Sequence, residues 1–195
     1  MLVRMLIEGF GQLELNNASF RRSGNVEAQC KLDETVFVES PCENGMLLVV
    51  DKPAKRIKLY DPEKAYLPVA INYSTEHMYD ERATGLKYHF LTAGTFLPRM
   101  GYPAVGDILT TNTIAYDTDN FEDDDALKEA IANIDETPLF GQPCANGAIE
   151  IVETPTNETN VLFQVVKGAT MPDGQYGVKF IAIKPFLADT ENIGD

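Results

Sequence analysis

Short apolar or β-branched runs, separated by glycine, proline and asparagine, constrain the fold of this chain most. Such runs lie at residues 35–39, 46–50, 56–59, 108–112 and 161–166. Turn-forming pairs and triplets separate several of them, because Asn and Gly adopt left-handed conformations at low cost. Strands repeated about every 8 to 12 residues with such turns are typical of all-β proteins. The sequence therefore predicts a mainly β protein, built as an antiparallel β-barrel or sandwich.

One segment departs from this pattern and has the period of a helix. Leu127, Ile131 and Ile134 are spaced i, i+4 and i+7, which places them on one apolar stripe. Acidic residues precede the stripe, and the helix dipole favours negative charge at that end. We predict one short amphipathic helix near residues 123–134, inserted between strands and covering an open end of the barrel.

The first 34 residues contain apolar side chains in an open, glycine-punctuated segment. Leu13-Glu14-Leu15 alternates as a strand does, and exposed apolar groups of this kind need a cover. Two interpretations stay open: a hairpin on the edge of the protein's own sheet, or an extended N-terminal arm on a neighbouring subunit or scaffold. The predicted organisation is an arm or hairpin at 1–34, a β domain at 35–185, and a flexible acidic tail at 186–195.

The chain is strongly acidic, with 30 Asp and Glu against 16 Lys and Arg and a net charge of −14. This balance argues against nucleic acid or an anionic membrane as a partner. Residues 117–136 hold nine acidic residues and one Lys, for a net charge of 1 − 9 = −8. A calcium loop is the competing interpretation, but Phe121 and Glu122 stand where an oxygen ligand and a glycine are needed. We predict a solvated acidic face, and no metal or cofactor.

The residue types that carry catalysis do not form a recognisable motif. Cys30, Cys42 and Cys144 are sparse and have no CxxC spacing, which predicts reduced, partly buried thiols. His77 and His89 are the only histidines, and neither lies in a catalytic signature. The sequence predicts that the protein is not an enzyme. A hydrolase or metal-dependent enzyme that uses the acidic cluster is a rival hypothesis.

A short phrase occurs twice. Ser40-Pro-Cys-Glu-Asn-Gly45 returns as Gln142-Pro-Cys-Ala-Asn-Gly147, and an apolar run follows each copy. Two interpretations are open: two hairpins that need the same turn, or two related β units that pair about a pseudo-dyad.

Several blocks of the chain together resemble one family of proteins. These blocks are residues 6–15 with 26–30, 43–51 with 56–59, 98–101 with 105–112, and 163–166 with 171–174. Together they resemble the capsid decoration (auxiliary, head-stabilising) proteins of tailed phages of Gram-positive bacteria. The likeness consists of turn-and-strand phrases, and the acidic helix is not part of it.

The resemblance implies a β-rich structural protein that binds the outer surface of a phage capsid and stabilises the shell. It implies the major capsid protein as partner, with self-association as a trimer or dimer left open. The protein would be made in the bacterial cytoplasm and lie on the capsid exterior of the virion. It implies no catalytic residues. The alternative is a receptor- or glycan-binding β module of a phage tail or fibre.

We expect the arm to carry the contact with the capsid or with a sister copy, because its apolar residues lack a local cover. The predicted contact residues are Phe10, Leu13, Leu15, Phe20, Arg21 and Arg22. If this is right, deletion of residues 1–33 leaves a folded domain that no longer binds capsids.

Overall fold

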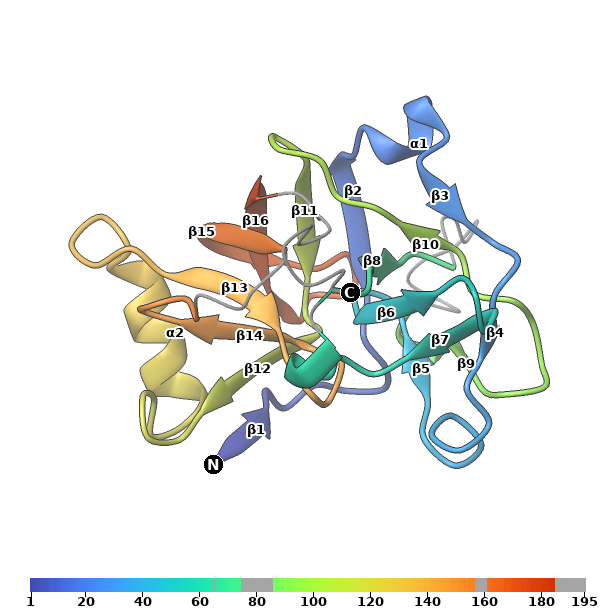
Figure 1. Ribbon diagram of the computed structural model, residues 1–195. Coiled ribbons are helices and arrows are strands. Elements are labelled where there is room, and N and C mark those ends of the chain that lie inside the picture. The colour runs from blue at the N-terminus through green and yellow to red at the C-terminus, as the bar shows by residue number, and fades with distance from the viewer. Residues whose placement is uncertain (65, 75–85, 157–160, 185–195) are drawn as a thin grey trace.

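The computed structural model describes residues 1–64, 66–74, 86–156 and 161–184, and within them the protein is mainly β. Two large sheets of eight and six strands, one two-stranded sheet and two short α-helices make up the fold (Figure 1). The prediction of a mainly β protein is confirmed. No closed barrel forms among the described residues.

The eight-stranded sheet contains both the N-terminal strand and the last described strands. Its order is β1 (Leu2–Arg4), β12 (Ile114–Asp117), β14 (Ile149–Val152), β13 (Phe140–Pro143), β15 (Leu162–Thr170), β16 (Tyr176–Lys184), β11 (Ile108–Thr111) and β2 (Leu13–Asn17). The long β15–β16 hairpin turns at Asp173-Gly174, where Gly174 has a φ of +91° that favours glycine.

The six-stranded sheet is built from the first half of the chain. Its order is β3 (Val26–Glu27), β10 (Met100–Gly101), β8 (Val69–Asn72), β6 (Leu47–Asp51), β7 (Arg56–Lys58) and β4 (Lys31–Leu32). The small third sheet pairs β5 (Cys42–Glu43) with β9 (Phe90–Leu91). Two 3₁₀ turns, η1 (Pro62–Lys64) and η2 (Leu86–Tyr88), lie in the connections.

The prediction of purely antiparallel pairing is wrong at two places. β12 pairs with β14 in parallel, and so does β4 with β7. A parallel pair needs a long crossover, and the chain from β12 to β14 supplies one through α2 and β13. One segment, residues 108–117, supplies strands near both ends of the eight-stranded sheet. The sheet therefore curls back toward its own start.

The predicted helix is present as α2 (Asp124–Ala132). Asp123 caps it by accepting hydrogen bonds from the backbone N–H groups of Asp125 and Ala126, at 3.0 and 2.8 Å. Leu127 and Ile131 are buried, as their spacing predicts. The helix packs beside β15 at one end of the molecule (Figure 1). A second helix, α1 (Phe20–Ser23), is a single turn that the sequence did not predict.

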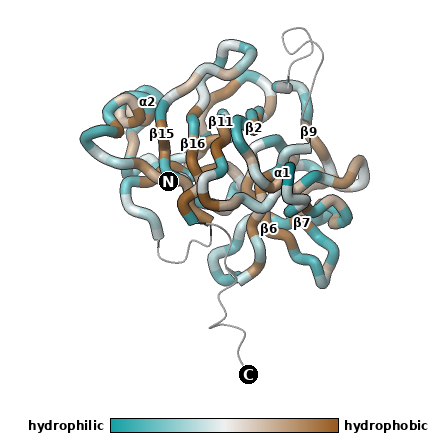
Figure 2. The backbone as a smooth tube through the Cα atoms, turned by 90° about the horizontal axis from the view of Figure 1, so that it is seen from above, coloured by the Kyte–Doolittle hydropathy of each residue, from teal (hydrophilic) through white to brown (hydrophobic). Residues whose placement is uncertain are grey.

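The apolar interior consists of two main clusters on opposite faces of the six-stranded sheet. Along β6, Leu47 and Val49 belong to the larger cluster, shared with the eight-stranded sheet, while Leu48 and Val50 belong to the smaller one. β6 is thus apolar at consecutive positions because both of its faces are covered. Figure 2 shows the hydrophobic segments gathered along β11, β15, β16 and β6. No described helix is both long and apolar enough to cross a membrane.

The N-terminal segment does not form an arm that leaves the protein, nor a hairpin. β1 pairs with β12, and β2 pairs with β11, so the two strands lie at opposite edges of the eight-stranded sheet. The two runs expected to form the hairpin, at residues 13–15 and 26–30, supply β2 and β3, which lie at edges of different sheets. Of the hairpin interpretation, only the placement on an edge of the protein's own sheet holds. The three-part division of the chain stays a prediction, and the tail at 186–195 lies outside the described residues.

A buried polar junction connects the N-terminal segment and both large sheets. Arg4 donates from Nη1 and Nη2 to the two carboxylate oxygens of Glu43, and the Gly11 backbone N–H donates to the same carboxylate. The Asn72 amide donates to the Glu43 carbonyl at 2.8 Å. Thr113 of the β11–β12 link donates from Oγ1 to the Asn44 carbonyl at 2.6 Å. These bonds satisfy both oxygens of the Glu43 carboxylate, which would otherwise be costly to bury.

The repeated phrase ends in two turns that touch each other. Gly45 and Gly147 both adopt left-handed φ angles, of +85° and +82°. The Leu47 backbone N–H, directly after the first turn, donates to the Gly147 carbonyl at 2.8 Å. The second copy joins a hairpin, β13–β14, whereas β5 and β6 around the first copy do not pair. The interpretation as two equivalent hairpins is therefore wrong.

Replacing Glu43 with Ala should destabilise the protein by about 2–4 kcal/mol, because removing one partner leaves the Arg4 guanidinium and the Gly11 N–H without an acceptor. Chemical denaturation followed by circular dichroism measures this. Glu63→Ala, which removes an exposed carboxylate from η1, should change stability by less than about 0.5 kcal/mol. Equal stability of the two variants would contradict the role of the junction.

Candidate interaction surface

The structure separates the six residues predicted to contact a partner. Leu13 and Phe20 are buried in the protein's own core, so the prediction that they face another chain is wrong. The Phe20 ring packs against Tyr73, with 5.2 Å between ring centroids. It also occupies the space above Gly101, where an added Cβ would lie 2.3 Å from the ring. Packing of the Phe20 ring thus holds α1 against the six-stranded sheet.

The other four predicted contact residues lie at two separate places. Leu15, Arg21 and Arg22 line a shallow hollow of about 300 Å³ together with Asn16, Asn17 and Ala18. Phe10 lies elsewhere and packs against Phe90 with the rings tilted, their centroids 4.3 Å apart. The six residues therefore do not form one surface.

Phe20→Ala should destabilise the protein by about 3–5 kcal/mol, because it leaves a cavity in a filled core. Phe96→Ala is the matched control, since this phenylalanine is 80% exposed and its truncation should cost less than about 0.5 kcal/mol. Urea unfolding curves of the two variants and the wild type give the loss of unfolding free energy for each substitution. If Phe20 contacted only a partner chain, both curves would coincide with that of the wild type.

Hydrogen bonds fix two loops at the far end of the six-stranded sheet, the first of which is residues 33–41 between β4 and β5. Asp33 accepts hydrogen bonds from the Thr35 N–H at 2.8 Å and the Thr35 hydroxyl at 2.6 Å, and these bonds lower the pKa of the Asp33 carboxyl. Phe37 is fully buried beneath this turn. The Ala93 N–H donates to the Phe37 carbonyl at 2.8 Å, which ties the second loop, residues 92–99, to the first.

These anchored loops hold large apolar side chains out in solvent. Phe96 is 80% exposed, Val38 is 60% exposed and Leu97 is 46% exposed. Phe96 and Leu97 line a hollow of about 190 Å³ with Lys31, Leu32, Glu34, Gly94 and Thr95. We call the group formed by Lys31, Val38, Phe96 and Leu97 the tip surface. Because exposed apolar side chains that gather in one place mark interaction sites, we take the tip surface as a candidate contact site.

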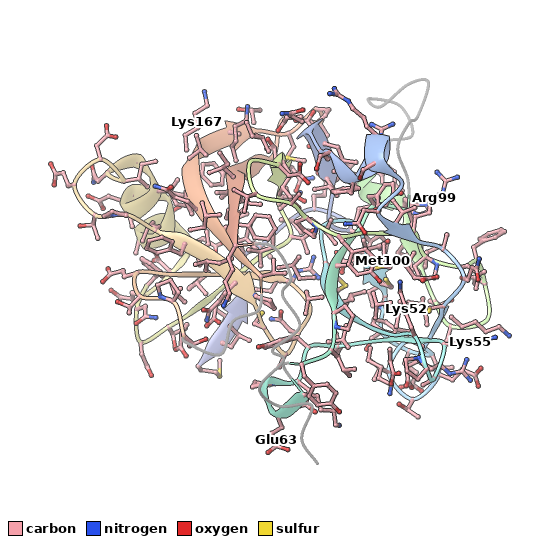
Figure 3. All side chains as sticks on the ribbon, turned by 45° about the horizontal axis from the view of Figure 1, so that its top comes forward. Lys52, Lys55, Glu63, Arg99, Met100 and Lys167 are labelled. Atoms are coloured by element: carbon pink, nitrogen blue, oxygen red, sulfur yellow. The ribbon has the colours of Figure 1, made fainter. Side chains whose placement is uncertain are left out.

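The tip surface and the α2 end of the molecule differ in charge. Residues 86–101 contain Lys87 and Arg99 and no acidic residue, whereas residues 117–136 have a net charge of −8. Figure 3 shows Arg99 with Lys52 and Lys55 on the side of the six-stranded sheet. Lys31 forms no ion pair with a described residue. The first tip loop also contains Asp33, Glu34 and Glu39, so the tip carries charges of both signs and lacks the dense negative charge of the α2 end.

Several of the clustered acidic residues have structural partners. Asp124 accepts hydrogen bonds from the Tyr116 hydroxyl at 2.8 Å and from the Leu6 N–H at 2.9 Å, which joins α2 to the N-terminal segment. Asp117 pairs with the N-terminal amine and raises the pKa of that amine. Among the described residues, no three His, Cys, Asp or Glu side chains are placed to hold a metal ion.

The three cysteines are free and buried, rather than partly buried as the sequence suggests. Burial raises the pKa of each thiol, to about 12 for Cys144. Cys42 accepts a hydrogen bond from the Asn72 amide at 3.3 Å. Because a nucleophilic cysteine needs a lowered pKa, these thiols are suited to packing. His77 lies outside the described residues.

Comparison with known proteins gives no match: no protein-family model, curated protein or solved structure is similar to this chain.

Sequence reasoning missed the tip surface. Phe96 and Leu97 stand between a turn and Pro98 in a stretch whose composition predicts only a bend. A useful signal was available, because two large apolar residues beside a Thr-Ala-Gly-Thr turn have no strand or helix period that would bury them.

Proposed function

We propose that the protein is a capsid decoration protein, a structural protein that binds the outer surface of a phage capsid and stabilises the shell. In this proposal the tip surface contacts the capsid, in place of the N-terminal segment that the sequence predicted for this contact. The observation that carries the proposal is the exposure of Phe96, Leu97 and Val38 on loops fixed by hydrogen bonds. The proposed role is not catalytic.

The placement of charge supports this orientation. A protein docked through its tip surface directs α2 and its acidic neighbours away from the shell (Figure 1). Negative charge on the outside of a particle favours solubility and opposes clumping. The proposed partner is the major capsid protein, and the proposed architecture is a stack of sheets like a sandwich, with the tip at one end.

Apolar contact repeated at many sites would stabilise a shell even if each contact is modest. Burying one large apolar side chain contributes about 1.5–3 kcal/mol. A protein that binds assembled shells in preference to free subunits shifts the equilibrium toward the shell. A loop that is already fixed by hydrogen bonds also loses little conformational entropy on docking.

Replacing Phe96 with Ser should lower occupancy of undecorated capsids, with an affinity weaker by about ten-fold or more because the apolar contact is lost. The measurement mixes purified protein with capsids, pellets them and counts copies per shell across a concentration series. Val105→Ser, which changes an exposed aliphatic residue in the turn before β11, should bind like the wild type. Failure of the wild-type protein to pellet with capsids would refute the proposed function, and equal binding by both variants would refute the tip surface.

An aromatic cluster favours a second candidate, a receptor- or glycan-binding module of a phage tail or fibre. The Phe10 ring packs against Phe90 at a tilt of 37°, and exposed Tyr88, two residues before Phe90, has the Lys87 ammonium 5.3 Å from its ring centroid. Aromatic faces of this kind suit sugar rings. The copy number per virion separates the two functions, since a decoration protein is abundant on the head and a tail module is present in few copies.

A further inference from the structure

The second half of β15 has an unpaired edge. β13 pairs with β15 only at Phe140–Gln164 and Gly141–Phe163, and one further bond joins the Val165 N–H to the Leu139 carbonyl at 2.9 Å. The residue before Leu139 is Pro138, which has no N–H to donate, and the chain there comes from α2. In the described parts of the chain, no strand pairs with residues 166–170 on this side.

The alternation of an antiparallel strand identifies the free backbone groups. The Met171 N–H donates to the Gln175 carbonyl, so Met171 faces β16. Backbone direction alternates along the strand, so the N–H and C=O groups of Ala169 and Lys167 also point toward β16. Those of Gly168 and Thr170 point away from it. Outside β16, no described residue forms a hydrogen bond with these groups.

A groove lies between this edge and α2. Its volume is about 540 Å³, and its apolar wall is formed by half-buried Ile134 above the buried Ile131. The other lining residues are Lys128, Ala132, Asp135, Tyr176 and residues 166–170. Gly168 has no side chain there, and a Cβ at this position would lie 2.5 Å from the Tyr176 hydroxyl. The Tyr176 ring therefore lies over Gly168 on one face of the strand.

The charges at the edge favour a carboxylate. Lys167 points away from the sheet (Figure 3), and its partner across the β15–β16 pair is Lys179. Like charges directly opposite one another are destabilising. Neither lysine forms an ion pair with another residue in the described ranges, although the chain has nearly twice as many acidic as basic residues.

We propose that the free edge of β15 accepts an extended segment of a partner protein as an additional strand. Its backbone would bond with Gly168 and Thr170, alternate apolar side chains would contact the half-buried Ile134, and an Asp or Glu would lie opposite Lys167. Strand addition of this kind takes affinity from backbone hydrogen bonds and specificity from alternate side chains. This site is separate from the tip surface and does not depend on the proposed function.

The probe is a fluorescein-labelled, C-terminally amidated peptide of sequence Thr-Val-Glu-Val-Thr-Val. Saturable binding is expected by fluorescence anisotropy, with a dissociation constant below about 100 µM. Amide hydrogen exchange should show the Gly168 and Thr170 N–H groups protected at least about ten-fold by the peptide. Absence of binding, or protection confined to other strands, would overturn the proposal.

Two variants at one position separate backbone bonding from side-chain contact. Thr170→Pro removes an N–H that does not bond β16, so it should weaken binding by about ten-fold or more while the hairpin persists. Thr170→Val keeps the N–H and should bind within about two-fold of the wild type. Equal affinity of the two variants would overturn the proposal.

A charge exchange tests the site without altering the backbone. Lys167→Glu should weaken binding of the Glu peptide by about five-fold and strengthen binding of the same peptide with Lys in place of Glu by a similar factor. If the wild type prefers the Lys peptide, the acidic residues near α2 dominate, and the proposed carboxylate contact is refuted.

Discussion

The buried carboxylate of Glu43 is the interaction on which the arrangement of the sheets depends. It lies on β5, between the sheets, and its oxygens accept from Arg4 of β1 and from the Gly11 backbone. A buried charge is tolerated only when it is paired and hydrogen-bonded, and here each donor comes from the N-terminal segment. The first eleven residues therefore contribute to the buried polar contacts of the fold. A deletion of residues 1–33 would remove this support together with four edge strands, β1 and β2 of the eight-stranded sheet and β3 and β4 of the six-stranded sheet.

The same junction explains why a short phrase occurs twice in the chain. Each copy ends in a left-handed glycine that lets the backbone turn sharply, and the two turns meet where the sheets approach. At Gly45 an added Cβ would lie 2.3 Å from the Thr111 hydroxyl, so glycine is also needed there for close approach. The repeat thus marks two chain reversals in contact. The pseudo-dyad stays a hypothesis, since β5–β6 and β13–β14 differ in pairing.

Local features of the fold could be predicted from the sequence, whereas long-range pairings could not. The spacing of Leu127, Ile131 and Ile134 and the Asp123 cap act within one helix, so α2 was predicted almost to its ends. The N-terminal strands were placed wrongly because β2 finds its partner β11 about ninety residues later in the chain. The parallel pairing of β12 with β14 is likewise a property of the crossover. Apolar composition showed that Phe10, Leu13 and Phe20 need a cover, but not which chain provides it.

Both candidate surfaces lie where the fold leaves groups without an internal contact: apolar side chains at the tip and backbone N–H and C=O groups at β15. At the tip, hydrogen bonds of Asp33 and Phe37 fix the backbone, while the interior is already filled by Phe37 itself, so Phe96 and Val38 remain outside. At β15, Pro138 ends the ladder and leaves Gly168 and Thr170 without partners. The first surface lacks apolar contact and the second lacks backbone hydrogen bonds. They would therefore select different partners, an apolar protein surface at the tip and an extended strand at β15.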